Sequence, residues 1–204
     1  MPRQIDYYFS LSSPWAYIGH KVFREVVTTY NLKVNHKPVI LIDLFSETGG
    51  LPLVKRHPVR QRYRMIELQR WRDKRGLNFH LKPKYSPLNA RLADGVVIAA
   101  IEAGYDPDPF LQRAFPAVWE DQLNLADPQT VADLADDAGL PGRVTFRLES
   151  IAPGVCEMAG KPRLADHRAI AREPGLASLF RNRSGQHERR PWYPGRVAIA
   201  SGIA

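Results

Sequence analysis

The sequence predicts an α/β fold in which a strand–helix–strand unit is followed by a long helical segment. Two observations carry this prediction. Two segments with strand-like patterns, at residues 4–11 and 32–41, enclose a helical pattern, and most of residues 46–142 have helical periodicity. No internal repeat or low-complexity tract is present. We therefore expect a βαβ unit over residues 1–45 and a helical domain inserted over residues 46–142.

The βαβ unit begins with residues 4–11, where apolar and polar side chains alternate and aromatic residues are frequent, as in a strand. Residues 32–41 predict a second strand. Because a helix lies between them within about 40 residues, we expect parallel strands joined by a right-handed crossover. In that helix an apolar residue recurs at every fourth position and forms one face: Ile18, Val22, Val26 and Tyr30.

The helical segment opens with a turn-rich loop, "SETGGLPLVKRHP", at residues 46–58. Gly76 is placed to end the first helix after it, and Pro116 to bend or break the third. The fourth has the clearest start, with Asp127 as N-cap and Pro128 at the first helical position. The four predicted helices span residues 59–76, 88–104, 108–123 and 126–142.

Composition and charge exclude several classes of function. The 204 residues carry a formal net charge of +8, but residues 1–142 hold 18 Lys+Arg against 16 Asp+Glu, whereas residues 143–204 hold 11 against 5. We therefore expect a solvated basic surface near the end of the chain and no nucleic-acid partner. The single cysteine, Cys156, excludes an internal disulfide and a cysteine-built zinc site. No two of the six histidines are spaced as a metal pair on one helix.

The apolar residues are distributed as in a protein that is not embedded in a membrane. Hydrophobic residues make up 44% of the chain, which suffices for a packed core. No run of about 18 apolar residues is present, and the first residues, "MPRQIDYYFSLSS", lack the apolar stretch of a secretory signal. We expect a cytoplasmic protein with no membrane partner.

The turn between the first strand and the first helix contains Ser13, Pro14, Trp15 and Ala16. Serine before proline is a routine helix start, because serine caps the N-terminus and proline fits the first helical position. The same helix end attracts anions through its unpaired N–H groups and its dipole. Two interpretations of Ser13 follow: a helix cap, or a hydrogen-bond donor to a thiolate. Since Cys156 is distant in sequence, that sulfur would belong to a bound cofactor.

The free energies involved allow the second interpretation. A free thiol with a pKa near 8.5 is only about 3% ionised at pH 7. Lowering this pKa by about 2 units takes about 2.7 kcal/mol. A hydroxyl that donates to the charged sulfur supplies about 1.5–3 kcal/mol, and the helix N-terminus adds roughly 0.3–1 kcal/mol. Together these two contributions are sufficient.

The turn and the segments after it resemble one family. "SPWA" is similar to the Cys-Pro-x-Cys site of thioredoxin-type proteins, with Ser13 and Ala16 in place of the cysteines. An aromatic strand followed by Ser-Pro, an aromatic residue, Tyr and a helix resembles the 2-hydroxychromene-2-carboxylate isomerases and the kappa-class glutathione transferases. The resemblance covers about 140 residues and continues in order and spacing through "TGGLPL", "PVRQRYRMIELQRWRDKRGL", "LKPKYSPLNARLA" and "FPAVWEDQLNLADPQTVADLADDAGL".

This resemblance implies a thioredoxin-like fold, glutathione as the cofactor and a small aromatic substrate, without a metal. Ser13 matches the catalytic serine that hydrogen-bonds the glutathione sulfur, and Ser12 is the weaker candidate for that role. The reaction implied is cis/trans isomerisation in aromatic compound catabolism, through transient addition of the thiolate to a conjugated system. The family usually forms dimers, so we also expect a homodimer.

The resemblance also implies four binding residues. Arg60 and Pro14 match positions near glutathione, and Asn89 and Trp15 match positions that face the substrate. The alternatives are an exposed helix arginine for Arg60 and a polar residue at a helix start for Asn89. Where this chain has Gly49-Gly50 the family often has asparagine, and this difference removes one expected contact.

The resemblance stops near Gly142. The family continues with a Gly-Val-Pro segment, a strand and a Gly-x-x-Arg-Leu helix start, and this sequence has none of them. We therefore predict an atypical, poorly folded segment over residues 143–204, in place of the rest of the thioredoxin-like domain. Two origins stay open for it: a shifted reading frame in a GC-rich gene, and genuine divergence.

Two other functions remain open from the sequence. A kappa-like glutathione transferase or peroxidase would use the same serine with a different substrate pocket. A degenerate thioredoxin-like module without catalytic activity would account for the missing C-terminal motifs.

Overall fold

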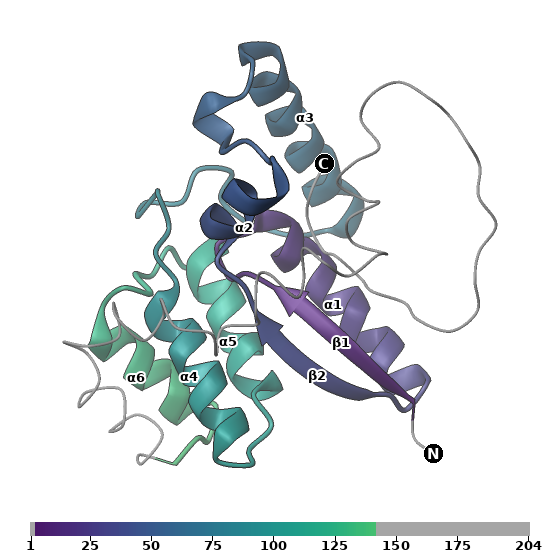
Figure 1. Cartoon of the computed structure of the whole chain (residues 1–204), viewed down its shortest axis with the longest axis vertical. Coiled ribbons are helices and arrows are strands. Elements are labelled where there is room, and N and C mark those ends of the chain that lie inside the picture. The colour runs from purple at the N-terminus through teal and green to yellow at the C-terminus, as the bar shows by residue number, and fades with distance from the viewer. Residues whose placement is uncertain (1–2, 142–204) are drawn as a thin grey trace.

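Two parallel strands, β1 (Gln4–Phe9) and β2 (Lys33–Pro38), form the sheet of the computed structural model. Helix α1 (Pro14–Thr29) connects them, which confirms the predicted βαβ unit (Figure 1). The structure describes residues 3–141. The prediction for residues 143–204 therefore lies outside the described residues.

The four predicted helices are present, and their observed ends differ from the predicted ones by at most five residues. Gly76 follows the longest of them with φ 59°, in the left-handed region that favours glycine. Pro116 lies inside a helix as predicted. Asp127 is an N-cap whose Oδ2 accepts a hydrogen bond from the Thr130 N–H at 2.9 Å. After β2 the described chain forms α2 (Leu41–Thr48), the 3-10 helix η1 (Leu53–Lys55), α3 (Pro58–Arg75), α4 (Arg91–Glu102), α5 (Asp108–Trp119) and α6 (Pro128–Asp137).

The segment after β2 differs from the prediction. The strand expected over residues 32–41 stops at Pro38, and residues 41–48 form α2, where the end of a strand and a loop were predicted. The short apolar run in this region fits a strand and a buried helix equally well. In the structure this apolar run begins the amphipathic helix α2, in which Leu44 is buried and Ile42 is exposed.

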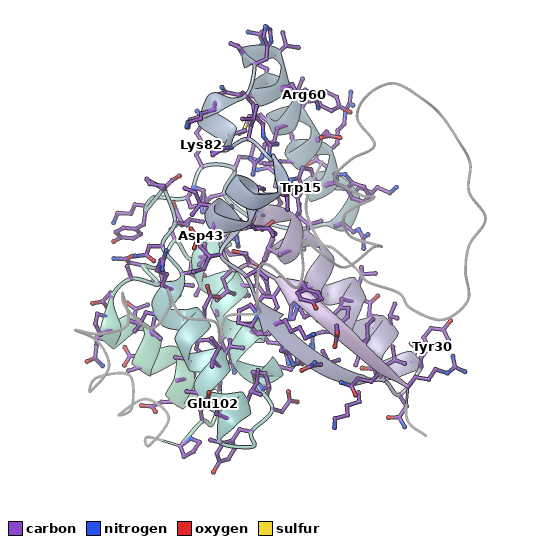
Figure 2. All side chains as sticks on the ribbon, in the orientation of Figure 1. Trp15, Tyr30, Asp43, Arg60, Lys82 and Glu102 are labelled. Atoms are coloured by element: carbon purple, nitrogen blue, oxygen red, sulfur yellow. The ribbon has the colours of Figure 1, made fainter. Side chains whose placement is uncertain are left out.

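The first strand and helix also differ in detail. The strand predicted over residues 4–11 ends at Phe9, because the chain turns there and the Ser13 N–H donates to the Ser10 carbonyl at 3.0 Å. Tyr30, predicted on the apolar face of the first helix, is 63% exposed. Figure 2 shows Tyr30 at the C-terminal end of α1, where it is the first residue after the helix.

The core lies on one face of the sheet, between the strands and two helices. Tyr7 on β1 stacks on Phe23 of α1 with ring centroids 4.0 Å apart, and Phe9 lies 6.3 Å from Phe115 of α5. Helices α1 and α5 therefore cover the same face. The opposite face carries a polar group in which the Asp6 carboxylate accepts hydrogen bonds from β2.

Two hydrogen bonds join the end of α5 to the βαβ unit. The Trp119 indole Nε1 donates to the Leu11 carbonyl at 3.1 Å, and Leu11 is fully buried. The Tyr17 hydroxyl donates to Oε1 of Glu120 at 2.7 Å. Burial and the negative charge of Glu120 raise the pKa of Tyr17, so its hydroxyl stays protonated and remains a donor. These bonds fix the turn before α1 against the helical segment.

Two histidines are buried in this core. Nδ1 of His20 lies 3.2 Å from the Tyr7 hydroxyl, and Nε2 of His20 and of His36 have no hydrogen-bond partner among the described residues. Burial lowers the pKa of His20 to about 4, against the opposing effect of Asp108 3.9 Å away. Burial also lowers the pKa of His36. Both rings are therefore neutral at pH 7.

This burial makes the fold sensitive to acid. The unfolded chain binds a proton at each histidine below pH 6.5, whereas the folded chain resists protonation of His20 down to pH about 4. As the pH falls from 6.5 to about 4, His20 should therefore lower the free energy of unfolding by up to about 1.4 kcal/mol per pH unit, and His36 contributes in the same direction. Urea unfolding of the wild type and His20→Phe will test this. Relative to the variant, the wild type should lose stability as the pH falls through this range, and parallel curves for the two proteins would contradict the assignment.

Trp119→Phe should destabilise the fold by about 1–3 kcal/mol, because it keeps most of the apolar area but leaves the Leu11 carbonyl without its donor. Urea unfolding at pH 7 measures the change. Trp71→Phe is the matched control, since Trp71 is only partly buried against the core and no hydrogen bond depends on it in the described part of the chain. Equal losses in the two variants would show that the indole bond contributes nothing specific.

Candidate functional site

A cavity of about 940 Å³ opens beyond the C-terminal end of β1. Its walls come from the turn after β1, from α2, α3 and the start of α4, and from the loop between α3 and α4. The end of α5 closes one side. Much of the wall is apolar and comes from Ile42, Phe45, Leu53, Met65, Leu81 and Trp119.

Four cationic side chains share this cavity: Arg62, Arg64, Lys82 and Arg91. Burial and the neighbouring Arg56 lower the pKa of the half-buried Arg64, although a guanidinium keeps its charge in proteins. Arg91 has a distant carboxylate partner, Oδ2 of Asp43, 3.9 Å from its Nη2. An apolar cavity with several cations suits a ligand that combines anionic groups with an apolar part.

The serine turn borders this cavity through two of its hydroxyls. Ser10 and Ser12 line the wall, and their Oγ atoms are 2.8 Å apart. Ser13 is the N-cap of α1: its Oγ accepts a hydrogen bond from the Ala16 N–H at 3.3 Å. Ser13 is only 3% exposed and is not part of the cavity wall. The cap uses Ser13 as an acceptor, so the hydroxyl hydrogen remains available for donation.

The other predicted site residues are distributed unevenly around the cavity. Pro14 is buried at the first position of α1, and Trp15 packs against the core, so neither forms the wall. Asn89 lines the cavity, and its Oδ1 accepts a hydrogen bond from the Arg91 N–H at 3.2 Å at the start of α4. Asn89 thus lies in the cavity wall and has the local role of a polar residue at a helix start, and its contact with a substrate stays a prediction.

Arg60 lies on α3 but outside the cavity wall, and its side chain is exposed (Figure 2). Gln61, Arg64 and Met65 line the cavity with the i, i+3, i+4 spacing of one helix face, and Arg62 extends this wall on the side of Met65. Arg60, one turn before Arg64, lies beyond the opposite edge of the wall.

Of the two glycines at 49 and 50, Gly50 leaves space that an aromatic ring takes. Gly49 follows α2 with φ 75°, a left-handed conformation. A Cβ at position 50 would lie 2.8 Å from Cδ1 of Phe45. Phe45, itself part of the cavity wall, therefore packs directly over Gly50. The chain has an aromatic ring near the place where the resemblance led us to look for an asparagine.

Sequence reasoning missed Arg64, Arg91 and Asp94, although a signal existed for each. Arg64 belongs to the i, i+3, i+4 face of α3 described above. Arg91 and Asp94 are three residues apart at the start of α4 and so share a face. Asp94 also interrupts the apolar stripe of α4, where Ala93 and Val97 are fully buried. A lone carboxylate in such a stripe is a strong indication of a special role.

Asp94 is the buried acid of this cavity. It is 3% exposed and lines the wall, and its Oδ1 has no hydrogen-bond partner among the described residues. Burial raises its pKa to about 8, and the nearby positive charge of Arg91 opposes this only in part.

The described part of the chain offers no group of three or more His, Cys, Asp or Glu side chains that could hold a metal ion. None of its helices is long and apolar enough to cross a membrane.

Comparisons with known proteins identify the fold. A solved 2-hydroxychromene-2-carboxylate isomerase matches with a TM-score of 0.63 and 19% sequence identity, over 82% of this chain and 81% of that one. A probable DsbA oxidoreductase from Streptomyces coelicolor matches with a TM-score of 0.59 and 16% identity, over 82% of this chain and 74% of that one. At these identities the similarity concerns the fold. No curated protein matches the sequence.

The family assignment rests on the sequence. The profile of the DSBA-like thioredoxin domain matches residues 4–152, which include the βαβ unit, the serine turn and every helix described above. The predicted thioredoxin-like fold is thereby confirmed. This chain belongs to the DSBA-like thioredoxin domain family.

Proposed function

We propose that the protein is a glutathione-dependent cis/trans isomerase that acts on a small aromatic compound in a catabolic reaction. The observation that carries this proposal is a cavity with four cations beside the serine turn at the N-terminus of α1. We place the activity in the cytoplasm, where glutathione keeps thiols reduced.

Glutathione fits the side chains of the cavity. Its two carboxylates match a wall that carries Arg62, Arg64, Lys82 and Arg91. The volume of about 940 Å³ is in the range of small-molecule sites and leaves room for a second, aromatic ligand against Phe45 and Trp119. This pairing of cations with an apolar wall favours two ligands, one anionic and one aromatic.

The residues of the turn would hold the sulfur. When bound, glutathione would supply a thiolate for reversible addition to a conjugated double bond: the bond is single and can rotate while the sulfur is attached, and the double bond re-forms when the thiolate leaves. The N-terminus of α1 favours a negative charge, since its first N–H groups point toward the turn. Ser13 supplies the hydroxyl hydrogen in this proposal, because its capping bond leaves that hydrogen unused. Ser12, which lines the cavity, is the competing donor.

The other two candidate functions predict different results. A transferase would join glutathione to an electrophilic aromatic compound and release a stable conjugate, with no isomerisation. A module without catalytic activity would bind no glutathione. The cavity favours a function that requires an anionic ligand over the inert module.

The serine variants test the proposed thiolate site. Bound glutathione should have a thiol pKa about 2 units below the free value near 8.5, measured from thiolate ultraviolet absorbance as the pH is varied. Ser13→Gly removes the hydroxyl at a capping cost of only a few tenths of a kcal/mol. It should return the thiol pKa by roughly 1–2 units toward the free value. A matched Ser12→Gly should leave the pKa low.

Reversal of these two results would assign the donor role to Ser12 instead. An unshifted thiol pKa in the wild type, or no binding of glutathione at all, would contradict the proposed function.

The cations are tested separately from the sulfur by S-methylglutathione, which keeps both carboxylates but has no thiol. Arg64→Gln should weaken its binding by about tenfold, because a charge-assisted hydrogen bond is lost. Arg70→Gln is the matched control, since Arg70 is an exposed arginine of the same helix outside the cavity wall. Isothermal titration calorimetry gives both affinities. Equal effects of the two changes would show that the cavity does not hold the tripeptide.

A further inference from the structure

We propose that Asp94 is a protonated carboxylic acid at neutral pH and donates a hydrogen bond to a carboxylate of the ligand in this cavity. This inference rests on the proposed function in that it takes the cavity as the ligand site. It assigns a role to a side chain that the glutathione mechanism does not use.

Asp94 lies where an apolar residue would be expected. Its neighbours on the inner face of α4, Ala93 and Val97, are completely buried, and Asp94 itself is 3% exposed. An ionised carboxylate in such a place costs several kcal/mol unless it is paired or hydrogen-bonded. Oδ1 of Asp94 has no such partner among the described residues. The group can avoid this cost by keeping its proton.

The nearest cation does not neutralise Asp94. Arg91, one turn earlier on α4, has its Nη2 3.9 Å from Oδ2 of Asp43 on α2. No ion pair joins Arg91 to Asp94 within the described residues. Arg91 does lower the pKa of Asp94, but burial raises it more, to about 8. The acid is therefore protonated at pH 7 and becomes an anion in mildly alkaline solution.

The remaining charged groups of the cavity are all positive. Arg62 and Arg64 come from α3 and Lys82 from the loop before α4. The other elements packed against α4 are β2, α5 and α6. Their titratable side chains are outside the cavity wall: Lys33, His36, Lys37, Asp108, Arg113, Asp133, Asp136 and Asp137. Among the described residues that line the cavity, Asp94 is thus the acidic side chain, and the other charged side chains are cations.

This arrangement selects for carboxylates in two ways. The cations attract the negative charge, and the neutral acid donates a hydrogen bond to it, as a protonated carboxyl has one O–H donor. Deprotonation would reverse the second effect, since a carboxylate would then face a carboxylate. The ligand carboxylate could come from the aromatic substrate or from glutathione. The shared chemistry is an anionic carboxylate oxygen, and two probes separate the sources.

The first probe is benzoate alone, without glutathione, and the second is S-methylglutathione alone. Calorimetric titrations with the full-length protein from pH 6.5 to 9.5 compare the wild type with Asp94→Asn, which cannot ionise and keeps a donor. For one of the probes, the wild-type dissociation constant should rise above pH 8, by up to tenfold per pH unit. Asp94→Asn should show no such rise. Because titration of the probe itself would affect both proteins equally, a rise in the wild type alone comes from Asp94.

Two further variants sharpen this result. Asp94→Ala should bind the same probe about tenfold more weakly at pH 7, because the donor is absent. Asp73→Asn is the matched control: Asp73 is an exposed acid on α3 whose nearest cation is Arg72 at 3.7 Å. This variant loses one negative charge outside the cavity and should keep the wild-type dependence on pH.

Protein stability provides a readout that needs no ligand. In the unfolded chain Asp94 ionises near pH 4, whereas in the folded chain it keeps its proton to about pH 8. The folded state binds the extra proton, so this residue makes wild-type stability fall as the pH rises from about 4 to 8. Urea midpoints of Asp94→Asn should lack this part of the fall, and those of Asp73→Asn should retain it.

The outcomes separate this inference from the proposed function. If glutathione does not bind but the wild-type affinity for benzoate falls above pH 8 and that of Asp94→Asn does not, the role of Asp94 stands and the glutathione proposal is wrong. If S-methylglutathione alone shows the dependence on pH, Asp94 binds a carboxylate of the tripeptide. The inference is wrong if neither probe binds, if wild type and Asp94→Asn have the same dependence on pH, or if their urea midpoints run parallel.

Discussion

The contact between the end of α5 and the turn before α1 is the constraint on which the site depends. The Trp119 indole donates to the Leu11 carbonyl in the turn, and the Tyr17 hydroxyl at the start of α1 donates to Glu120. Each of these hydrogen bonds joins two residues that are more than 100 positions apart in the sequence. Because Leu11 is fully buried, its carbonyl has no access to water and needs this donor. The serines that follow Leu11 are thereby held at a fixed place beside the cavity.

A rigid turn matters because the proposed chemistry depends on small electrostatic contributions that must act together. The helix N-terminus and one hydroxyl each supply a few kcal/mol at most. They add only if both are directed at the same atom, which requires the turn to be fixed before the ligand arrives. The cavity adds long-range attraction through its four cations, while its apolar wall limits screening by water.

Local sequence patterns predicted most of the helices and strands, but fewer of the residues that line the cavity. The βαβ unit and four helices follow from periodicity, from Gly76 and from the Asp127 cap, because each signal acts over a few residues. Helix α2 was missed because a short apolar run has no period that separates strand from helix. The placement of Arg60 outside the cavity wall and of Arg64 within it depends on the rotation of α3, which is set by packing. Asp94 interrupts the apolar stripe of α4, but the cavity that it lines is formed by elements distant in sequence, so its place there did not follow from this local signal.

A crystal structure of the full-length protein with bound glutathione tests the central claim most directly. The account predicts a sulfur atom within hydrogen-bond distance of a serine hydroxyl in the turn at residues 10–13, with the tripeptide carboxylates directed toward the cations of α3 and α4. A tripeptide outside the cavity, or one whose sulfur points away from the N-terminus of α1, would contradict it.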